Sequence, residues 1–474
     1  MLRRDALKLI GAGFLPFIIS GKLKALNKFL ESSLKASDFK KFTWGISSAA
    51  VQVEGAWDTD GKGPSIWDTF SKIKGKIKDG STPETACDFY NRYPQDIEII
   101  KQLGFGANRF SISWPRIIPL GTGQKNQNGI DFYNRVIDKS LEKGIEPWVT
   151  LYHWDLPQAL EDRGGWTNRE IVNWFSDYAS LCAKSFGDRV KHWIVLNEPL
   201  SFTGLGYGIG YHAPGLKGLR HFLPAIHHAV LCQAEGGRVL RNEVANAVIG
   251  SAFSCSPIDP QHQSHRDEKA ARRLDAFINR LFAEPTLGMG YPFDDLHFLK
   301  KIEKYMLPGD EEKMKFNFDF FGLQYYFRIV ADFSIFNPIL WANQVPPIKR
   351  HVPITEMNWE VYPDGMYRVL KQFSKYPVKE FVITENGAAF KDTLSDGQVN
   401  DIQRTNFFQD YLQDLLKAKN EGINVTGYFA WSLLDNFEWV EGFYPRFGLV
   451  YVDHKSQERI IKNSGKWFSE FLRE

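Results

Sequence analysis

The chain has 474 residues, of which 43% are hydrophobic and 15% aromatic, so it can bury a large core. Its 58 basic and 56 acidic residues give a formal net charge of +2 and are spread along the chain. This balance gives no support for nucleic-acid binding or for an electrostatic attachment to a membrane. No Gly-, Ser- or Pro-rich linker divides the chain, and α/β barrels of this size commonly form one domain.

The first 37 residues differ in character from the rest. Arg3 and Arg4 precede an apolar stretch from Leu9 to Ile19, which is too short to span a bilayer but suits the apolar region of an export signal. The arginine pair resembles a twin-arginine signal, with Ala6 where that pattern usually has Phe or Leu. We expect residues 1–37 to be an export signal with a tether or pro-segment; a plain amphipathic helix is the alternative. The protein would then be periplasmic or otherwise exported, and membrane-tethered if the signal is uncleaved.

In residues 38–474 a short apolar run is followed by a longer amphipathic stretch, and this pattern recurs along the chain. Apolar residues that recur three and four apart predict helices in the amphipathic stretches. The eight apolar runs are Thr43–Ser47, Ala107–Ser113, Pro147–Tyr152, His192–Asn197, Ala247–Phe253, Phe320–Tyr325, Phe381–Thr384 and Val425–Ser432. The helical patterns are Asp96–Leu103, Ile130–Lys143, Arg169–Phe186, Leu223–Arg241, Gly365–Phe373 and Arg404–Glu421. This alternation predicts a single (β/α)8 TIM barrel, with a doubly wound sheet as the alternative fold.

Two of the apolar runs end on a glutamate. One run leads into Thr384-Glu385-Asn386-Gly387, and another ends at Asn197-Glu198-Pro199. A carboxylate at the tip of a buried strand is costly to desolvate, so it is either paired with a cation or used in chemistry. In a barrel the active site lies at the C-terminal ends of the strands, so the two glutamates can form a pair there.

Other polar and aromatic residues lie at the same predicted strand ends. Each of them alone is better explained as part of the core, but five of the eight strand ends carry such residues, and the two glutamates mark two further ends. This recurrence favours a shared site. The residues are Gln52, Glu54, Arg109, His153, Trp154, Tyr325, Tyr326, Trp431, Glu438 and Trp439.

Metal and nucleotide chemistry have no support in the sequence. The four cysteines form no CxxC pair and have no histidine at zinc spacing, so we expect free buried thiols. A G-x-G-x-x-A pattern at Gly208–Ala213 has no strand leading into it. No H-E-x-x-H or G-x-x-x-x-G-K-[ST] motif occurs, and we expect no cofactor and no metal.

Read together, these motifs resemble family 1 of the glycoside hydrolases, the β-glucosidase family. The resemblance covers nearly the whole chain after about Lys40. In chain order the motifs are Phe42-Thr-Trp44-Gly45, Gln52-Val-Glu54-Gly55, Asn108-Arg109-Phe-Ser-Ile-Ser-Trp114-Pro-Arg116, His153-Trp154-Asp155-Leu-Pro157, Gly164-Gly-Trp166, Asn197-Glu198-Pro199, Thr355-Glu-Met-Asn-Trp359-Glu, Thr384-Glu385-Asn386-Gly387 and Trp431-Ser-Leu-Leu-Asp-Asn-Phe-Glu438-Trp439.

The resemblance implies retaining hydrolysis of β-linked sugars from the non-reducing end of small glycosides or oligosaccharides. Glu198 matches the acid/base and Glu385 the nucleophile, and Arg109 and Tyr326 would support the ionised Glu385. The remaining matched positions would bind substrate. Those for the glycone hydroxyls are Gln52, His153, Asn197, Glu438 and Trp439; Trp431 matches the stacking platform, and Trp359 the wall of the leaving-group site.

Three positions depart from the family pattern. Val51 and Val195 replace polar or aromatic residues on strands, and Gln324 replaces the usual Asn before the tyrosine pair. The extra methylene of Gln324 could shift Tyr326.

A sugar-binding barrel that has lost catalysis is the alternative function. It is disfavoured because both glutamates are present. We expect a small β-glycoside as the partner, no nucleic acid, and no membrane span in the mature domain, while the sequence does not specify the oligomeric state.

Overall fold

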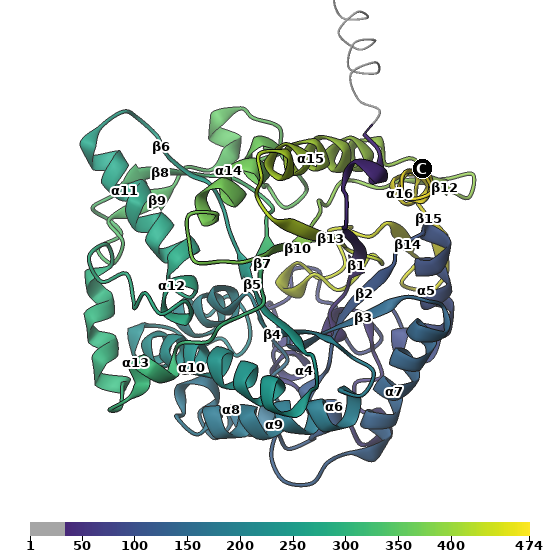
Figure 1. Ribbon diagram of the computed structural model, residues 1–474, viewed down its shortest axis with the longest axis horizontal. Coiled ribbons are helices and arrows are strands. Elements are labelled where there is room, and N and C mark those ends of the chain that lie inside the picture. Colours follow the sequence, from purple (N-terminus) through teal and green to yellow (C-terminus); the bar gives the residue numbers. More distant parts are fainter. Residues whose placement is uncertain (1–33) are drawn as a thin grey trace, which may run out of the picture.

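The computed structural model describes residues 34–474 and shows a closed barrel of parallel strands (Figure 1). The strand order is β1-β13-β10-β7-β5-β4-β3-β2, and the barrel closes where β1 pairs with β13. All eight predicted runs form its strands, so the (β/α)8 prediction is confirmed and the doubly wound sheet is excluded. The strands are β1 Thr43–Ser47, β2 Ala107–Ser111, β3 Glu146–Tyr152, β4 His192–Asn197, β5 Val248–Ser254, β7 Phe320–Gln324, β10 Phe381–Asn386 and β13 Val425–Trp431.

Helices surround the barrel (Figure 1), and all six predicted helical stretches are confirmed. The helix predicted from Asp96 begins earlier, at Phe89, and continues through Pro94. The longer helices are α5 Phe89–Leu103, α7 Gln127–Glu142, α9 Ile171–Phe186, α10 Leu219–Glu243, α11 His265–Asp275, α14 Asp364–Phe373, α15 Ile402–Asn420 and α16 Asn463–Phe471. The shorter ones are α3 Ala50–Val53, α4 Ile66–Ser71, α6 Trp114–Ile117, α8 Gln158–Glu161, α12 Ala283–Thr286 and α13 Asp310–Lys313.

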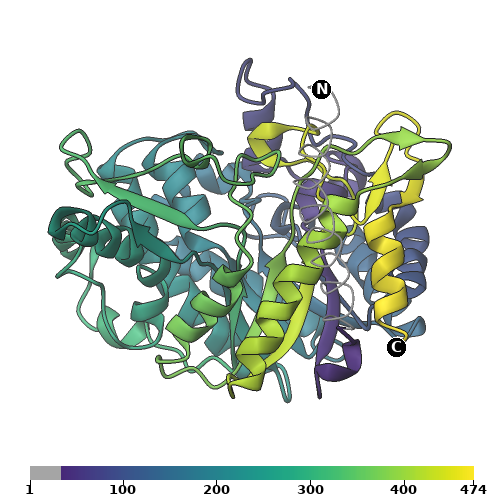
Figure 2. The same ribbon diagram turned by 90° about the horizontal axis from the view of Figure 1, so that it is seen from above.

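Small sheets and short helical turns occupy the loops between these elements. Figure 2 shows strands standing outside the barrel at two edges of the molecule. The extra strands are β6 Ile258–Pro260, β8 Ile329–Phe333, β9 Ala342–Gln344, β11 Leu394–Ser395, β12 Gln398–Val399, β14 Val450–Val452 and β15 Arg459–Ile461. The turns are η1 Ala36–Asp38, η2 Thr59–Gly61, η3 Gly165–Thr167, η4 Ser201–Gly208, η5 Ala276–Arg280, η6 His297–Tyr305, η7 Pro347–Arg350 and η8 Trp439–Glu441. Of these, η4 and η5 are π-helical.

One layer of apolar side chains fills the interior of the barrel beneath the polar residues at the strand ends. Its buried side chains come from seven of the barrel strands, and the largest are Trp148, Phe320 and Phe429. A second, larger core lies between the strands and the helices. The four cysteines are buried and free, as predicted.

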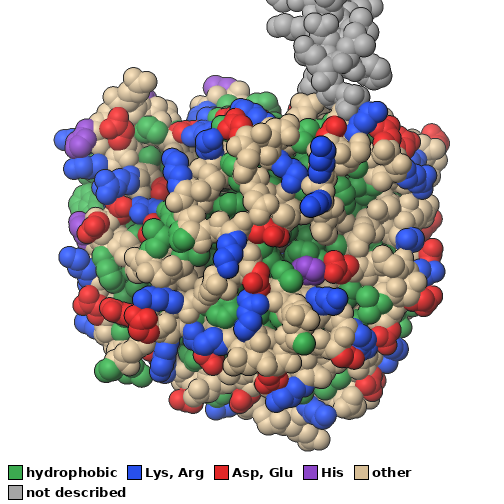
Figure 3. Space-filling model, viewed as in Figure 1, with side chains coloured by type: hydrophobic (Ala, Val, Ile, Leu, Met, Phe, Trp, Pro, Cys, Tyr) green, Lys and Arg blue, Asp and Glu red, His purple; other side chains and the backbone are tan. Residues whose placement is uncertain are grey.

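The surface agrees with the balanced composition. On the face shown in Figure 3, acidic and basic side chains are interspersed, and neither sign covers a large area. Among the described residues, no helix combines the length and hydropathy that crossing a bilayer requires. The export signal predicted at residues 1–37 lies almost entirely outside the described residues.

Candidate active site

The predicted site residues meet at the C-terminal ends of the strands, around a cavity of about 620 Å³. Arg109 and Gln52 lie directly behind the cavity wall and hydrogen-bond to residues that line it. Ten of the other predicted residues line the cavity: His153, Trp154, Asn197, Glu198, Tyr326, Trp359, Glu385, Trp431, Glu438 and Trp439.

Glu385, at the end of β10, is held by two donors. Arg109 Nη1 donates to its Oε1 at 2.5 Å, and the Tyr326 hydroxyl donates to its Oε2 at 2.6 Å. Burial raises the pKa of Glu385, while the Arg109 charge and the Tyr326 hydrogen bond oppose that rise. Both partners stabilise the charged form, which a nucleophilic carboxylate requires.

Glu198, just beyond β4, has a different environment. It accepts a hydrogen bond from the Ser201 hydroxyl at 2.7 Å and has no cation in contact among the described residues. Burial, followed by the nearby charge of Glu385, raises the pKa of Glu198 to about 8. Glu198 is therefore protonated at neutral pH, as a general acid must be.

These environments predict the alkaline limb of the pH profile. If Glu198 donates the proton, kcat/KM should fall about tenfold per pH unit above about pH 8, because the ionised form cannot protonate a leaving group. We expect this limb in kcat/KM measured from pH 5 to 10 with an alkyl β-glucoside.

Glu438 requires a control, because burial and the charge of Glu385 also raise its pKa to about 8. In the Glu438→Gln variant, the pH at which kcat/KM begins to fall should stay within about one pH unit of the wild-type value. Loss of the limb in that variant would assign it to Glu438 and contradict the role given to Glu198.

A hydrogen-bond chain fixes the protonation of His153. The Asn197 Oδ1 accepts from Arg109 at 2.5 Å and from Gln324 Nε2 at 2.7 Å, so the Asn197 Nδ2 must donate to His153 Nε2 at 3.0 Å. Burial and the Arg109 charge hold the pKa of His153 well below its usual range. The single ring proton therefore sits on Nδ1, a buried atom without a partner in the described chain. That N–H is available to a sugar hydroxyl.

Gln52 and Glu438 form a second polar group. The Gln52 Nε2 donates to Asn436 Oδ1 and the Phe437 carbonyl at 2.9 Å, and to Glu438 Oε2 at 3.3 Å. The Gln52 Oε1 is buried without a partner in the described chain, so it can accept from a ligand hydroxyl.

Aromatic rings enclose the polar groups. The His153 ring lies 5.9 Å from both the Trp431 and the Trp439 rings. Trp359 lies 5.2 Å from the Tyr326 ring and 5.1 Å from the Phe327 ring. Flat apolar faces beside paired polar groups suit the C–H faces and hydroxyl rims of a sugar.

Two residues that were expected at the site, Glu54 and Tyr325, face elsewhere. Glu54 instead pairs with Arg116 at 2.9 Å and with Tyr133 at 2.5 Å. Tyr325 donates to the Tyr362 carbonyl. Neither lines the cavity. Glu54 follows the short helix α3, well beyond the end of β1. Tyr325 directly precedes Tyr326 at the end of β7, and successive residues of an extended segment point to opposite faces.

Two site residues have hydrogen-bond partners that were not predicted from the sequence: Ser201 contacts Glu198, and Asn436 contacts Gln52. Ser201 lies three residues after Glu198 in a helical turn, a spacing that was visible in the sequence. Asn436, which accepts from Gln52, lies inside the quoted motif from Trp431 to Trp439 but was given no role there. Gln324 does not displace Tyr326, since the Tyr326 hydroxyl reaches Glu385 while Gln324 turns toward Asn197. The strand position given to Val51 is wrong, because Val51 lies in the short helix α3.

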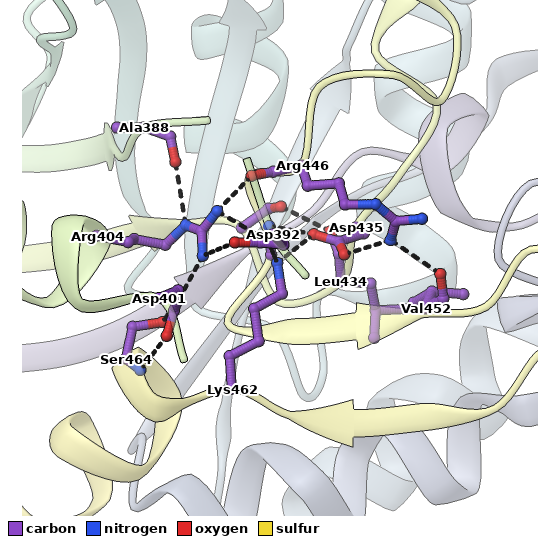
Figure 4. Close-up of polar contacts among 12 residues, drawn as sticks. Ala388, Asp392, Asp401, Arg404, Leu434, Asp435, Arg446, Val452, Lys462 and Ser464 are labelled. Atoms are coloured by element: carbon purple, nitrogen blue, oxygen red, sulfur yellow. Dashed lines mark hydrogen bonds and ion pairs between the residues drawn. The ribbon is translucent and has the colours of Figure 1, made fainter. Parts of the chain in front are cut away.

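A buried ionic network supports the loop that carries Glu438 (Figure 4). Lys462 Nζ bonds to Asp435 Oδ1 at 2.6 Å and also to Asp392. Arg446 Nη1 lies 2.7 Å from Asp435 Oδ2, and Arg446 does not line the cavity. Arg404 pairs with Asp392 and Asp401, so three cations face three carboxylates. Asp435 precedes Glu438 by three residues, so the network fixes the start of its loop.

Removing one cation from this network should destabilise the fold. The Lys462→Met variant would leave Asp392 and Asp435 buried with too little compensating charge, and we expect a loss of about 3–5 kcal/mol in the free energy of unfolding. Urea unfolding measures this loss. The matched control is Lys371→Met, which removes an exposed pair with Glu421 and should leave the midpoint nearly unchanged. Equal midpoints for both variants would contradict a stabilising network.

A buried pair of carboxyl groups at the mouth of a (β/α)8 barrel, one held by Arg109 and Tyr326 and the other with a raised pKa, is the arrangement that glycoside hydrolases use. The chain belongs to glycosyl hydrolase family 1, whose family model matches residues 35–474.

Individual relatives agree with this assignment. The β-glucosidase A of Thermotoga maritima is 45% identical over 435 residues, covering 91% of this chain and 97% of that protein. The 1,4-β-D-glucan glucohydrolase of Thermotoga neapolitana is 44% identical over 435 residues, again covering 91% and 97%. The solved structure of a β-glucosidase from T. maritima with glucoimidazole superposes with a TM-score of 0.88 at 45% identity, covering 92% of this chain and 98% of that one.

Proposed function

We propose that this protein is a retaining β-glucosidase that removes β-linked sugars from the non-reducing end of small glycosides by double displacement. The observation that carries the proposal is the contrast within one cavity between Glu385, which is held by Arg109 and Tyr326, and Glu198, which contacts the Ser201 hydroxyl and has its pKa raised to about 8. Membership of the family supports the same reaction.

In the first step a Glu385 oxygen attacks the anomeric carbon while Glu198 protonates the departing glycosidic oxygen. The C–O bond to the leaving group breaks, and an ester bond to Glu385 forms. Glu198 is now ionised and removes a proton from water, which attacks the same carbon from the face that the leaving group vacated, and the ester bond between that carbon and Glu385 breaks. The sugar is released with its original configuration, and both carboxyls return to their starting states.

The surrounding groups hold the sugar during both steps. The His153 Nδ1 donor and the Gln52 Oε1 acceptor are positioned for hydroxyls, and the protonated Glu438 can donate as well as accept. The Trp431 ring offers a face for stacking. Bonds that strengthen as charge develops on the ring lower the barrier more than they tighten substrate binding.

Release of an aryl alcohol from an aryl β-glucoside tests the proposal. We expect turnover at pH 6 to 7 with retention of configuration. NMR identifies the anomer of the sugar that is released first. Sugar binding without release at any pH would support the alternative, a sugar-binding barrel. A panel of aryl β-glucoside, β-galactoside and β-fucoside would rank the glycones.

We propose in addition that the protein is exported in a folded state. The support is the sequence pattern of Arg3-Arg4 followed by an apolar stretch, which is typical of a twin-arginine signal. Changing both arginines to lysine should shift the protein toward the compartment of synthesis, measured by fractionation of the producing cells. An unchanged distribution would indicate a plain membrane-associating helix instead.

A further inference from the structure

A small sheet lies outside the barrel at one edge of the molecule (Figure 1). Its strands β6, β8 and β9 pack against α11 through a small apolar core of their own. The antiparallel pairing of β8 with β9 makes a hairpin, and residues 334–341 between the two strands form its tip. Because β8 begins at Ile329, which lines the catalytic cavity, the hairpin leaves the barrel at its active-site end.

The hairpin exposes a group of large apolar side chains. Five of the fifteen large hydrophobic side chains that are exposed in residues 34–474 lie within residues 335–348. Their exposed fractions are 61% for Ile335, 91% for Phe336, 46% for Ile339, 44% for Trp341 and 62% for Ile348. Single exposed apolar residues are ordinary, but a group of them indicates a contact surface.

Hydrogen bonds hold the tip in one shape. The Asn337 carbonyl accepts from the Trp341 N–H at 2.6 Å. The Asn337 side chain donates to the Ala342 carbonyl at 2.9 Å and accepts from the Leu340 N–H at 3.3 Å. Arg273 of α11 donates to the Leu340 carbonyl at 2.6 Å and to the Trp341 carbonyl at 2.9 Å. Because these backbone groups already have partners, moving the tip into an apolar medium leaves fewer of them unpaired.

Exposed cations border the apolar tip. Arg266 and Lys269 of α11 and Lys349 beyond β9 are exposed, and none of the three forms an ion pair with another described residue. The Arg266 guanidinium instead lies 5.6 Å from the Phe333 ring, at the base of the tip. Of the acids on α11 and β8, only Glu268 is exposed; Asp267 is buried, and Asp275 and Asp332 are half-buried. The outer border is therefore mainly positive, a local pattern that the net charge of +2 for the whole chain does not reveal.

We propose that the tip of the β8–β9 hairpin docks on an anionic phospholipid bilayer. Phe336 and Ile339 enter the headgroup region, and the cationic border lies against the lipid phosphates. Exposed aromatic and aliphatic side chains beside basic ones are typical of segments that bind the membrane interface. The export signal expected at residues 1–37 would bring the chain to a membrane, where the hairpin supplies a second contact. This inference goes beyond the proposed reaction and does not depend on it.

A second copy of the chain fits the hairpin less well. A stable dimer buries roughly 20–30 residues on each side, whereas the tip has eight residues. A two-fold contact would also bring each basic border close to the same border of the other copy, and like charges repel.

A dye on the tip tests the contact in the full chain. The four native cysteines are buried, so a thiol-reactive nitrobenzoxadiazole dye should label the Phe336→Cys variant at the tip alone. With vesicles of equimolar phosphatidylglycerol and phosphatidylcholine, its emission should rise severalfold and shift to shorter wavelength. The same dye on Leu307→Cys, a position that is 56% exposed outside the hairpin, should not respond.

Vesicle sedimentation measures the strength of the contact. Combining Phe336→Ser with Ile339→Ser should lower the partition coefficient about tenfold or more, because two large apolar side chains no longer leave water. The matched control combines Met289→Ser with Leu307→Ser, which are 53% and 56% exposed outside the hairpin, and should partition like the wild type. Combining Lys269→Gln with Lys349→Gln should weaken binding to the anionic vesicles about tenfold and leave binding to pure phosphatidylcholine unchanged. Circular dichroism establishes that each variant folds.

Three results would overturn the inference. A protein that sediments with vesicles while the tip dye stays unchanged would be held by residues 1–37 alone. Emission that rises with protein concentration in the absence of vesicles would indicate a second copy as the partner. Equal partition coefficients for the tip variant and its matched control would show that the exposed apolar side chains make no contact with lipid.

Discussion

Glu385→Ala should abolish turnover, with kcat reduced roughly 10⁴-fold or more for every substrate. The carboxylate forms the only covalent bond to the sugar in the proposed reaction, so the quality of the leaving group cannot compensate for its loss. Arg109 and Tyr326 would also lose the charge that they are arranged to contact. Steady-state release of 2,4-dinitrophenol from its β-glucoside measures the effect.

Azide distinguishes loss of the nucleophile from loss of the fold. In the space vacated by the Glu385 side chain, a small anion can attack the anomeric carbon directly and displace an activated leaving group. One displacement inverts the configuration, so the product should be the α-glucosyl azide. A folded variant that retains substantial turnover without added anion would contradict the assignment of Glu385 as nucleophile.

Much of the fold was predictable because parallel barrel strands are buried on both faces and read as continuous apolar runs. The run from Phe381 and the run from His192 each end on the glutamate that the structure places at the cavity. The motifs of the family then indicated the remaining site residues.

The environments of these residues were not predictable, because they depend on partners far apart in the sequence. Lys462, Asp392 and Asp435 form one buried network without any shared motif. The raised pKa of Glu438 likewise follows first from burial and then from the charge of Glu385, which is far away in the sequence. The expected strand-end position also failed for Glu54, which lies at the end of the short helix α3 and pairs with Arg116.

Glu198→Ala should have an effect that depends on the leaving group. In the first step a poor leaving group such as an alkoxide requires the proton of Glu198, whereas 2,4-dinitrophenolate departs without one. We expect kcat/KM to fall by a factor of about 10²–10⁴ for an alkyl glucoside and by far less for the dinitrophenyl glucoside. Measuring kcat/KM across aryl glucosides of graded acidity should give a much steeper dependence in the variant than in the wild type.

The second step supplies the decisive test of the two roles. Without Glu198 no base activates water, so the glucosyl ester on Glu385 should accumulate and kcat for the dinitrophenyl substrate should be low. Azide needs no base and fits the space that the carboxyl leaves, so it should raise kcat and capture the ester from the face of the original leaving group. Two inversions give the β-glucosyl azide. An α-azide from Glu198→Ala would mean that Glu198 is the nucleophile, because only a single displacement produces that anomer.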